Sequence, residues 1–145
     1  MKSIVAVICA GAVILLTAGC KKHTHHPDLP TVRGSWELRV EEGGFAGTIN
    51  YQPGNGNLVQ FDDMTYKRYA NGQLIKSGNY RVITDTSADR LMCHPESSGQ
   101  FTDRIIYDND ITGTKYYSQV TGNQLILISS NCWPDVPSKF VYARQ

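Results

Sequence analysis

The chain has 145 residues, with 14 basic and 13 acidic side chains and a formal net charge of +1. This length suits one domain with a short leader and leaves no room for two domains. The balance of charge argues against a nucleic-acid partner, because phosphate binding requires clustered lysines and arginines.

The N-terminal residues have the pattern of a bacterial lipoprotein signal. Lys2 is basic, an apolar run extends from Ile4 to Leu16, and small residues at 17–19 stand directly before Cys20. The run is too short for a transmembrane helix, which needs about 20 apolar residues. Because the small residues resemble a lipobox, we expect residues 1–19 to be removed and Cys20 to carry lipid.

Residues 20–31 are expected to form the lipidated cysteine and a flexible tether, because they are polar, contain prolines and show no apolar periodicity. His23, His25 and His26 could bind a transition metal, although such a run is more often a solvated spacer. Lys21 is not the aspartate associated with inner-membrane retention, so we expect the anchor to lie on the periplasmic face of the outer membrane of a Gram-negative cell. We also expect the protein to be a monomer.

Cysteine usage fits an oxidising compartment. After Cys9 leaves with the signal and Cys20 is lipidated, Cys93 and Cys132 remain. An even pair in the cell envelope predicts one disulfide bond. A reactive or metal-binding thiol pair is the alternative, but the two residues lack a C-x-x-C spacing.

Apolar and polar residues alternate with a period of two from Ser35 onward, most clearly over Trp36–Glu41, as in half-buried strands. No pattern of an amphipathic helix follows the signal. Further strands are predicted at 58–62, 64–69, 75–83, 90–93, 102–107, 115–120, 124–129 and 139–144. Eight or nine short strands joined mainly by hairpins predict that residues 32–145 form an all-β domain, an antiparallel up-and-down barrel of about eight strands.

The first and last strands of this predicted barrel carry a family resemblance. Gly34-Ser35-Trp36 resembles the G-x-W signature of lipocalins, and Arg144 resembles the arginine that those barrels lay across the tryptophan. A stack of this kind, a cation–π interaction of about 0.5–2 kcal/mol, would join the first and last strands. Residues 32–145 are similar to the lipocalin-like (calycin-like) domains of small bacterial envelope lipoproteins. The chain is shorter than a typical secreted lipocalin, which favours a smaller and more filled barrel.

The segment 42–57 is expected to be a long loop, placed where lipocalins have a flap over the open end. It combines glycines with apolar residues that either contact a ligand or plug the barrel mouth. Tyrosines on the strands can also line a pocket, although aromatic residues suit strands in any case. The candidates for ligand contact are Phe45, Ile49, Tyr51, Tyr66, Tyr80 and Tyr116.

Catalytic and metal-binding motifs have little support. His94 is the only histidine beyond the tether, and neither G-x-S-x-G nor H-E-x-x-H occurs. The segment 108–113 partly matches a calcium loop, but Gln119 stands where a bidentate glutamate is needed, so a hairpin turn is preferred.

These observations predict a protein that is not an enzyme and has no cofactor or metal. We expect a barrel that binds a small apolar ligand. The alternative is a protein-interaction module, similar in outline to the small barrel lipoproteins that inhibit lysozymes.

Overall fold

A computed structural model describes residues 31–87, 100–131 and 138–145. These residues form strands and turns only, which confirms the predicted all-β class. None of them belongs to a helix that could span a bilayer. The strands are β1 (Gly34–Glu42), β2 (Thr48–Asn50), β3 (Leu58–Phe61), β4 (Thr65–Ala70), β5 (Gln73–Thr84), β6 (Asp103–Tyr107), β7 (Tyr116–Thr121), β8 (Gln124–Ser129) and β9 (Lys139–Arg144).

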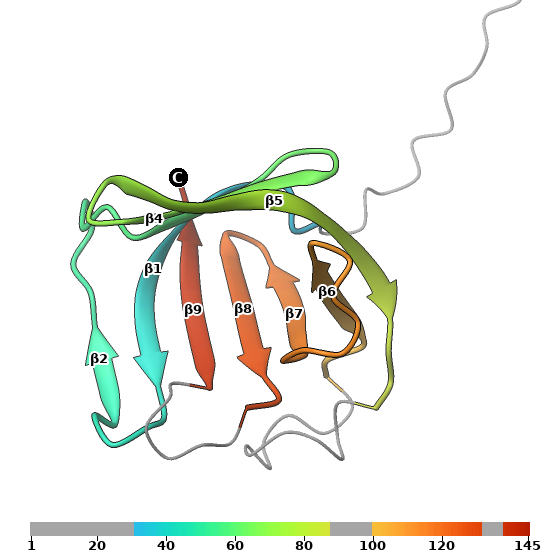
Figure 1. Ribbon diagram of the computed structural model, residues 1–145. Helices are drawn as coiled ribbons and strands as arrows, with labels where there is room; N and C mark the ends of the chain where they lie inside the picture. Colours follow the sequence, from blue (N-terminus) through green and yellow to red (C-terminus); the bar gives the residue numbers. More distant parts are fainter. Residues whose placement is uncertain (1–30, 88–99, 132–137) are drawn as a thin grey trace, which may run out of the picture.

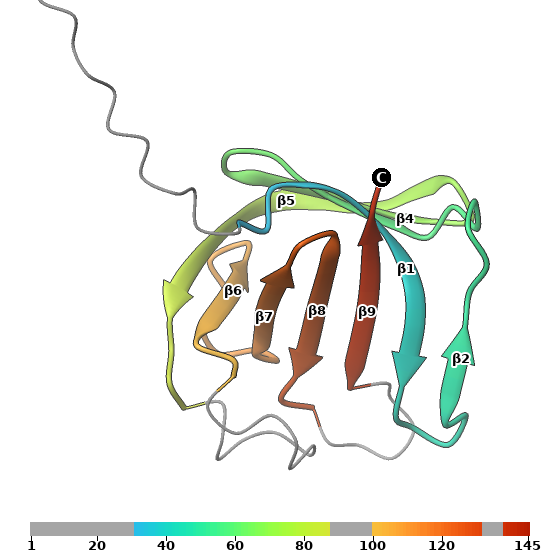
Figure 2. The same ribbon diagram turned by 180° about the vertical axis from the view of Figure 1, so that it is seen from behind.

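Eight strands close into an antiparallel barrel, in the order β1-β3-β4-β5-β6-β7-β8-β9, with β9 pairing back to β1 (Figures 1 and 2). The pairing of Trp36 with Arg144 lies in this closing ladder. Closure removes the two free edges that an open sheet would leave. The predicted up-and-down barrel is therefore confirmed.

The extra strand β2 lies within the segment 42–57, which was predicted to be a loop. One edge of β1 pairs with β3 over Gly34–Glu37 and with β2 over Val40–Glu42, while β9 lies along the other edge. The prediction of a continuous loop is wrong at Thr48–Asn50. Because β3 pairs only with Gly34–Glu37 of β1, the same edge of β1 is free beyond it, and Thr48–Asn50 pairs with Val40–Glu42 there.

The long strand β5 connects two parts of the barrel wall. Its first half pairs with β4 and its second half, Tyr80–Thr84, pairs with β6. Figures 1 and 2 show β5 crossing the ends of β9 and β8 before it bends down beside β6. The β4–β5 turn has positive φ at Asn71 (51°) and Gly72 (80°), as a tight hairpin requires.

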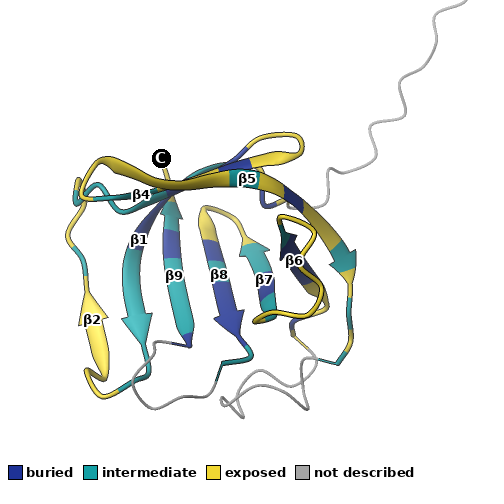
Figure 3. Cartoon of the chain, in the orientation of Figure 1, coloured by how far each residue is buried: buried dark blue, intermediate teal, exposed yellow. Residues whose placement is uncertain are grey.

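The main core lies inside the barrel, lined by inward-facing residues of its strands. Figure 3 shows the buried positions along these strands. Leu125 and Leu127 of β8 belong to this core, whereas Ile128 packs on the opposite face with Phe101 and Tyr117. The buried hydrophobic members of the main core are Val32, Trp36, Leu38, Val59, Phe61, Tyr66, Tyr80, Ile105, Leu125, Leu127 and Tyr142.

Several predictions fall outside the described residues. These are the signal at 1–19, the lipidated Cys20, the tether as far as residue 30 with its three histidines, the strand at 90–93, the Cys93–Cys132 pair and His94. They stay predictions.

Candidate ligand cavity

One end of the barrel is closed by a stacked tryptophan and arginine. Trp36 is 0% exposed, and its indole N–H donates to the carbonyl oxygen of Val32 at 2.7 Å. The guanidinium carbon of Arg144 lies 4.2 Å from the centroid of the Trp36 ring. Gly34 has a φ of 131°, and a Cβ there would come within 2.9 Å of Arg144 Nη1. Glycine therefore suits this position, and the three residues expected to close the barrel do lie together.

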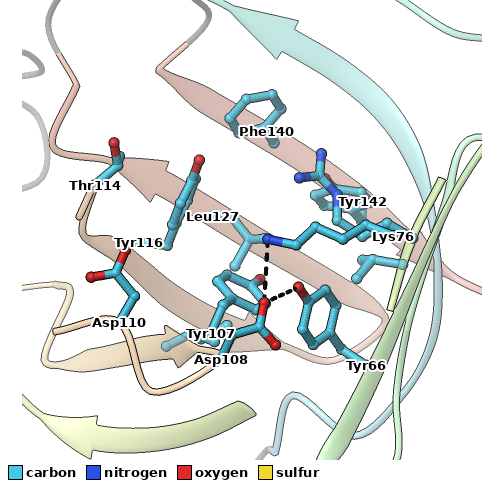
Figure 4. A pocket seen from close by; sticks show the side chains of 13 residues that line it. Tyr66, Lys76, Tyr107, Asp108, Asp110, Thr114, Tyr116, Leu127, Phe140 and Tyr142 are labelled. Atoms are coloured by element: carbon cyan, nitrogen blue, oxygen red, sulfur yellow. Dashed lines mark hydrogen bonds and ion pairs between the residues drawn. The ribbon is translucent and has the colours of Figure 1, made fainter. Parts of the chain in front are cut away.

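A cavity of about 270 Å³ opens inside the barrel between β4 and β5 on one side and β6 to β9 on the other (Figure 4). This volume is slightly below the usual range for small-molecule sites, roughly 300–1,000 Å³. Its lining combines apolar and tyrosine side chains with a few charged groups: Val59, Tyr66, Arg68, Lys76, Ile105, Tyr107, Asp108, Asp110, Thr114, Tyr116, Leu127, Phe140 and Tyr142.

Edge-to-face aromatic contacts hold the tyrosine wall in place. The ring of Tyr107 lies 4.7 Å from that of Tyr66 and 5.7 Å from that of Tyr116, with interplanar angles of 63° and 80°. This is the arrangement that aromatic rings prefer because of their quadrupoles. These contacts fix the orientations of the three tyrosine rings.

Asp108 lies at the edge of the cavity, called its rim below, and forms hydrogen bonds with β4 and β5. Tyr66 donates its hydroxyl proton to Asp108 Oδ2 at 2.9 Å, and the backbone N–H of Asn79 donates to Oδ1 at 3.1 Å. Lys76 Nζ lies 3.3 Å from Oδ2. The hydrogen bond from Tyr66 is the main reason why the pKa of Asp108 is lowered. Gly78 makes the approach possible, because a Cβ at this position would overlap Asp108 Oδ1.

Tyr142 is buried and Tyr107 is half-buried, and neither phenol hydroxyl has a hydrogen-bond partner among the described residues. Burial raises the pKa of Tyr142 to about 12 and raises the pKa of Tyr107 as well. Both hydroxyls are therefore neutral at physiological pH. A neutral phenol can donate one hydrogen bond and accept others, so each can contact a polar group of a ligand.

The structure brings some of the predicted ligand-contact residues together and separates others. Tyr66 and Tyr116 line the cavity. Tyr51 lines an adjoining hollow of about 140 Å³ and donates to Glu41 Oε2 at 3.1 Å. Tyr80 lines a separate hollow near Val32.

Phe45 and Ile49 lie away from the cavity lining. They are 84% and 36% exposed, because the β1–β2 hairpin extends along the barrel wall and does not fold over its mouth. The expectation that they contact a ligand in the barrel or plug its mouth is therefore not met by the geometry.

Nothing in the sequence indicates that Arg68, Lys76 and Asp108 would line the cavity, and Tyr107 and Tyr142 are included only among the strand tyrosines that can line a pocket. The period of two contains a signal for some of them, because Tyr107 follows the buried Ile105 by two positions. Charged residues that face inward break the apolar pattern, so Arg68 and Lys76 gave no comparable signal.

The turn after β6 has the structure of a hairpin connection. Asp110 Oδ1 accepts hydrogen bonds from the backbone N–H groups of Thr112 and Gly113 and from the Thr112 hydroxyl. Asp108 is turned toward Tyr66. Across the described ranges, no three His, Cys, Asp or Glu side chains are grouped so that they could hold a metal ion.

A second polar cluster contains a serine, a lysine and a tyrosine. Ser87 Oγ lies 3.2 Å from Lys115 Nζ and 3.0 Å from the Tyr117 hydroxyl, and it donates to Asp85. That hydrogen bond is the main cause that lowers the pKa of Asp85 to about 2, so Asp85 is too weak a base to activate the hydroxyl. Lys115 pairs with the same carboxylate at 3.5 Å. The cluster is organised as an ion-pair network.

Comparisons of the chain with protein-family models, with curated proteins and with solved structures find no match.

Proposed function

We propose that this protein is a lipid-anchored lipoprotein of the cell envelope that binds a small apolar molecule in its barrel without catalysing a reaction. The observation that carries the proposal is the cavity of about 270 Å³, which lies inside a closed barrel and has four tyrosines in its lining. A concave shape with aromatic walls is usual in a small-molecule pocket, and this lining also carries four charged side chains, Arg68, Lys76, Asp108 and Asp110.

The proposed anchor rests on the sequence. The lipobox-like residues before Cys20 and the polar tether favour a lipocalin-like domain held at a membrane, on the periplasmic face of the outer membrane. Changing Cys20 to serine should release the protein from the membrane fraction of expressing cells. Retention of the variant in that fraction would contradict the anchor.

Native mass spectrometry of the purified protein tests the binding role. A co-purifying small molecule supports a working cavity and identifies its chemical class. The same spectra, with and without reductant, test the proposed Cys93–Cys132 disulfide, because the oxidised form is lighter by about two hydrogen masses. If the protein arrives empty and takes up no apolar probe, the binding role is wrong.

The β1–β2 hairpin supports a second candidate, a protein-interaction module. Phe45 is 84% exposed at its turn, and aromatic anchors of this kind are common at the centres of protein interfaces. If an envelope protein is captured, Phe45→Ala should abolish capture whereas Tyr66→Phe inside the cavity should leave it unchanged. Capture that survives Phe45→Ala would exclude this hairpin as the docking surface.

A further inference from the structure

Four charged side chains line the cavity, of which two form an ion pair with each other and two form no ion pair with any described residue. Lys76 is paired with Asp108 at 3.3 Å, and Asp110 Oδ1 accepts hydrogen bonds of its own turn. Arg68 also lines the cavity, but its side chain forms no ion pair or hydrogen bond with any residue that the structure describes. Arg68 is therefore the one unpaired cation of the lining, and the carboxylate of Asp110, hydrogen-bonded within its turn, is the one carboxylate without an ion pair.

Arg68 lies at the boundary between water and the apolar interior. It is exposed, and it borders both the main cavity and the adjoining hollow together with Phe140 and Tyr142. A side chain in this position keeps its charge hydrated when the cavity is empty. A ligand with its body inside the barrel would bring its polar end to the guanidinium.

The phenol hydroxyls of the lining provide a second and independent indication of a polar ligand group. Tyr142 is only 6% exposed, lines the cavity and has no hydrogen-bond partner in the described chain. The Tyr142 hydroxyl oxygen is not one of the buried unpaired polar atoms of the described chain, which are Arg104 Nε and Ser129 Oγ, so it is accessible from the cavity and can bond to water or to a ligand there. The charge of Arg68 acts on Tyr142 and on Tyr107, which places all three groups in one electrostatic neighbourhood.

The other walls define the body of the ligand. Tyr66, Tyr107 and Tyr116 meet edge to face, and Phe140 and Leu127 line the same space (Figure 4). Flat rings pack well against such walls. The cavity of about 270 Å³ is small for a long flexible chain and suits one or two fused rings.

Resting on the proposed binding function, we propose that the ligand is a compact aromatic carboxylate, with its rings in the tyrosine-lined cavity and its carboxylate on Arg68 and the Tyr142 hydroxyl. A guanidinium matches a carboxylate with two parallel N–H donors. A doubly charged phosphate would need a second free cation, and Lys76 is held by Asp108.

A matched set of naphthyl compounds tests this assignment on the whole purified protein. The set is 2-naphthoate, neutral 2-naphthylmethanol and cationic 2-naphthylmethylammonium, and their dissociation constants are measured by calorimetry. We expect 2-naphthoate to bind at least about tenfold more tightly than the alcohol, as a charge-assisted hydrogen-bonded pair implies. Arg68→Gln should remove this preference and leave binding of the alcohol almost unchanged.

Lys67→Gln is the control variant, because Lys67 is the exposed neighbour of Arg68 on the opposite face of β4. It removes the same charge and should keep the preference for 2-naphthoate. A preference that survives Arg68→Gln, or tighter binding of the ammonium compound, would overturn the assignment. Equal binding of 2-naphthoate and the alcohol would overturn it while leaving the proposed function intact, whereas failure of all three compounds to bind would count against both.

Discussion

The two ends of the barrel interior place an arginine beside aromatic rings, yet they differ in how their polar groups are satisfied. At the closed end, Trp36 donates to Val32 and Arg144 donates to the carbonyl oxygen of Arg33 at 3.3 Å while it covers the indole. In the cavity, Arg68 and the Tyr142 hydroxyl have no partner among the described residues.

This difference separates two uses of similar side chains. A fully buried ring with its N–H bonded contributes to stability, because it removes apolar surface from water and leaves no polar atom unpaired. A cavity loses packing contacts and leaves hydroxyls without partners, so it is unfavourable for stability alone. The closed end is therefore suited to holding the barrel together, and the cavity to binding.

The largest expected effect is at the closed end. Trp36→Ala should lower the free energy of unfolding by about 3–5 kcal/mol, because it removes a fully buried ring and leaves a cavity beneath Arg144. Urea unfolding followed by far-UV circular dichroism measures the change. Phe45→Ala is the matched control, since it also truncates an aromatic ring but at an exposed site, and should change stability by no more than about 0.5 kcal/mol.

Equal losses of stability in the two variants would contradict the division between the closed end and the exposed hairpin. A folded Trp36→Ala protein with unchanged stability would show that the stacked pair does not hold β1 to β9. After either result, the closed end could no longer be described as the stabilising end of the barrel in contrast to the cavity.

The closed end was predictable because Gly34-Ser35-Trp36 and Arg144 resemble a family signature, although the contact itself joins the first and last strands. Glycine and tryptophan at the start of the first strand and arginine at the end of the last strand gave the stacked pair, and the period of two gave most strands. The strand Gln124–Ser129 was predicted with its observed bounds.

The cavity and β2 could be predicted only in part. The pairing of β2 depends on how much of the β1 edge β3 leaves free, which is a property of the assembled sheet. The approach of Asp108 to Tyr66 joins residues 42 positions apart and depends on the missing side chain of Gly78. Long-range contacts of this kind leave no periodic signal in the chain.

A change at Gly78 should disturb the cavity rim with a smaller effect on stability. Gly78→Ala would force Asp108 away, because the new Cβ would overlap its carboxylate and crowd the Tyr66 ring at 3.1 Å. We expect a loss of about 1–3 kcal/mol in the free energy of unfolding, since overpacking and two broken hydrogen bonds act together. Binding of an apolar probe should weaken in the same variant.

Ser77→Ala provides the control, because Ser77 is the exposed neighbour of Gly78 on the outer face of β5. It should alter neither stability nor probe binding appreciably. If Gly78→Ala left both properties unchanged, Asp108 would not be holding the rim in the way described.

The smallest expected effect comes from the charge of Asp108. The folded protein lowers the pKa of this carboxyl below its ordinary value of 3.8, chiefly through the Tyr66 hydroxyl. The resulting stabilisation is complete above pH 3.8 and is lost as the pH falls through the lowered pKa. Because the side chain is 41% exposed, water screens the interaction and we expect less than about 1 kcal/mol.

Asp108→Asn should therefore be slightly less stable than the unmodified protein near neutral pH, and the difference should shrink as the pH is lowered below 3.8 and the native carboxyl becomes protonated. Asp103→Asn removes one negative charge from an exposed position of β6 and controls for net charge. A difference that stays constant with pH would assign the effect of Asp108 to the shape of its side chain. The rim would then resemble the closed end, where packing and neutral hydrogen bonds around Trp36 hold the structure together.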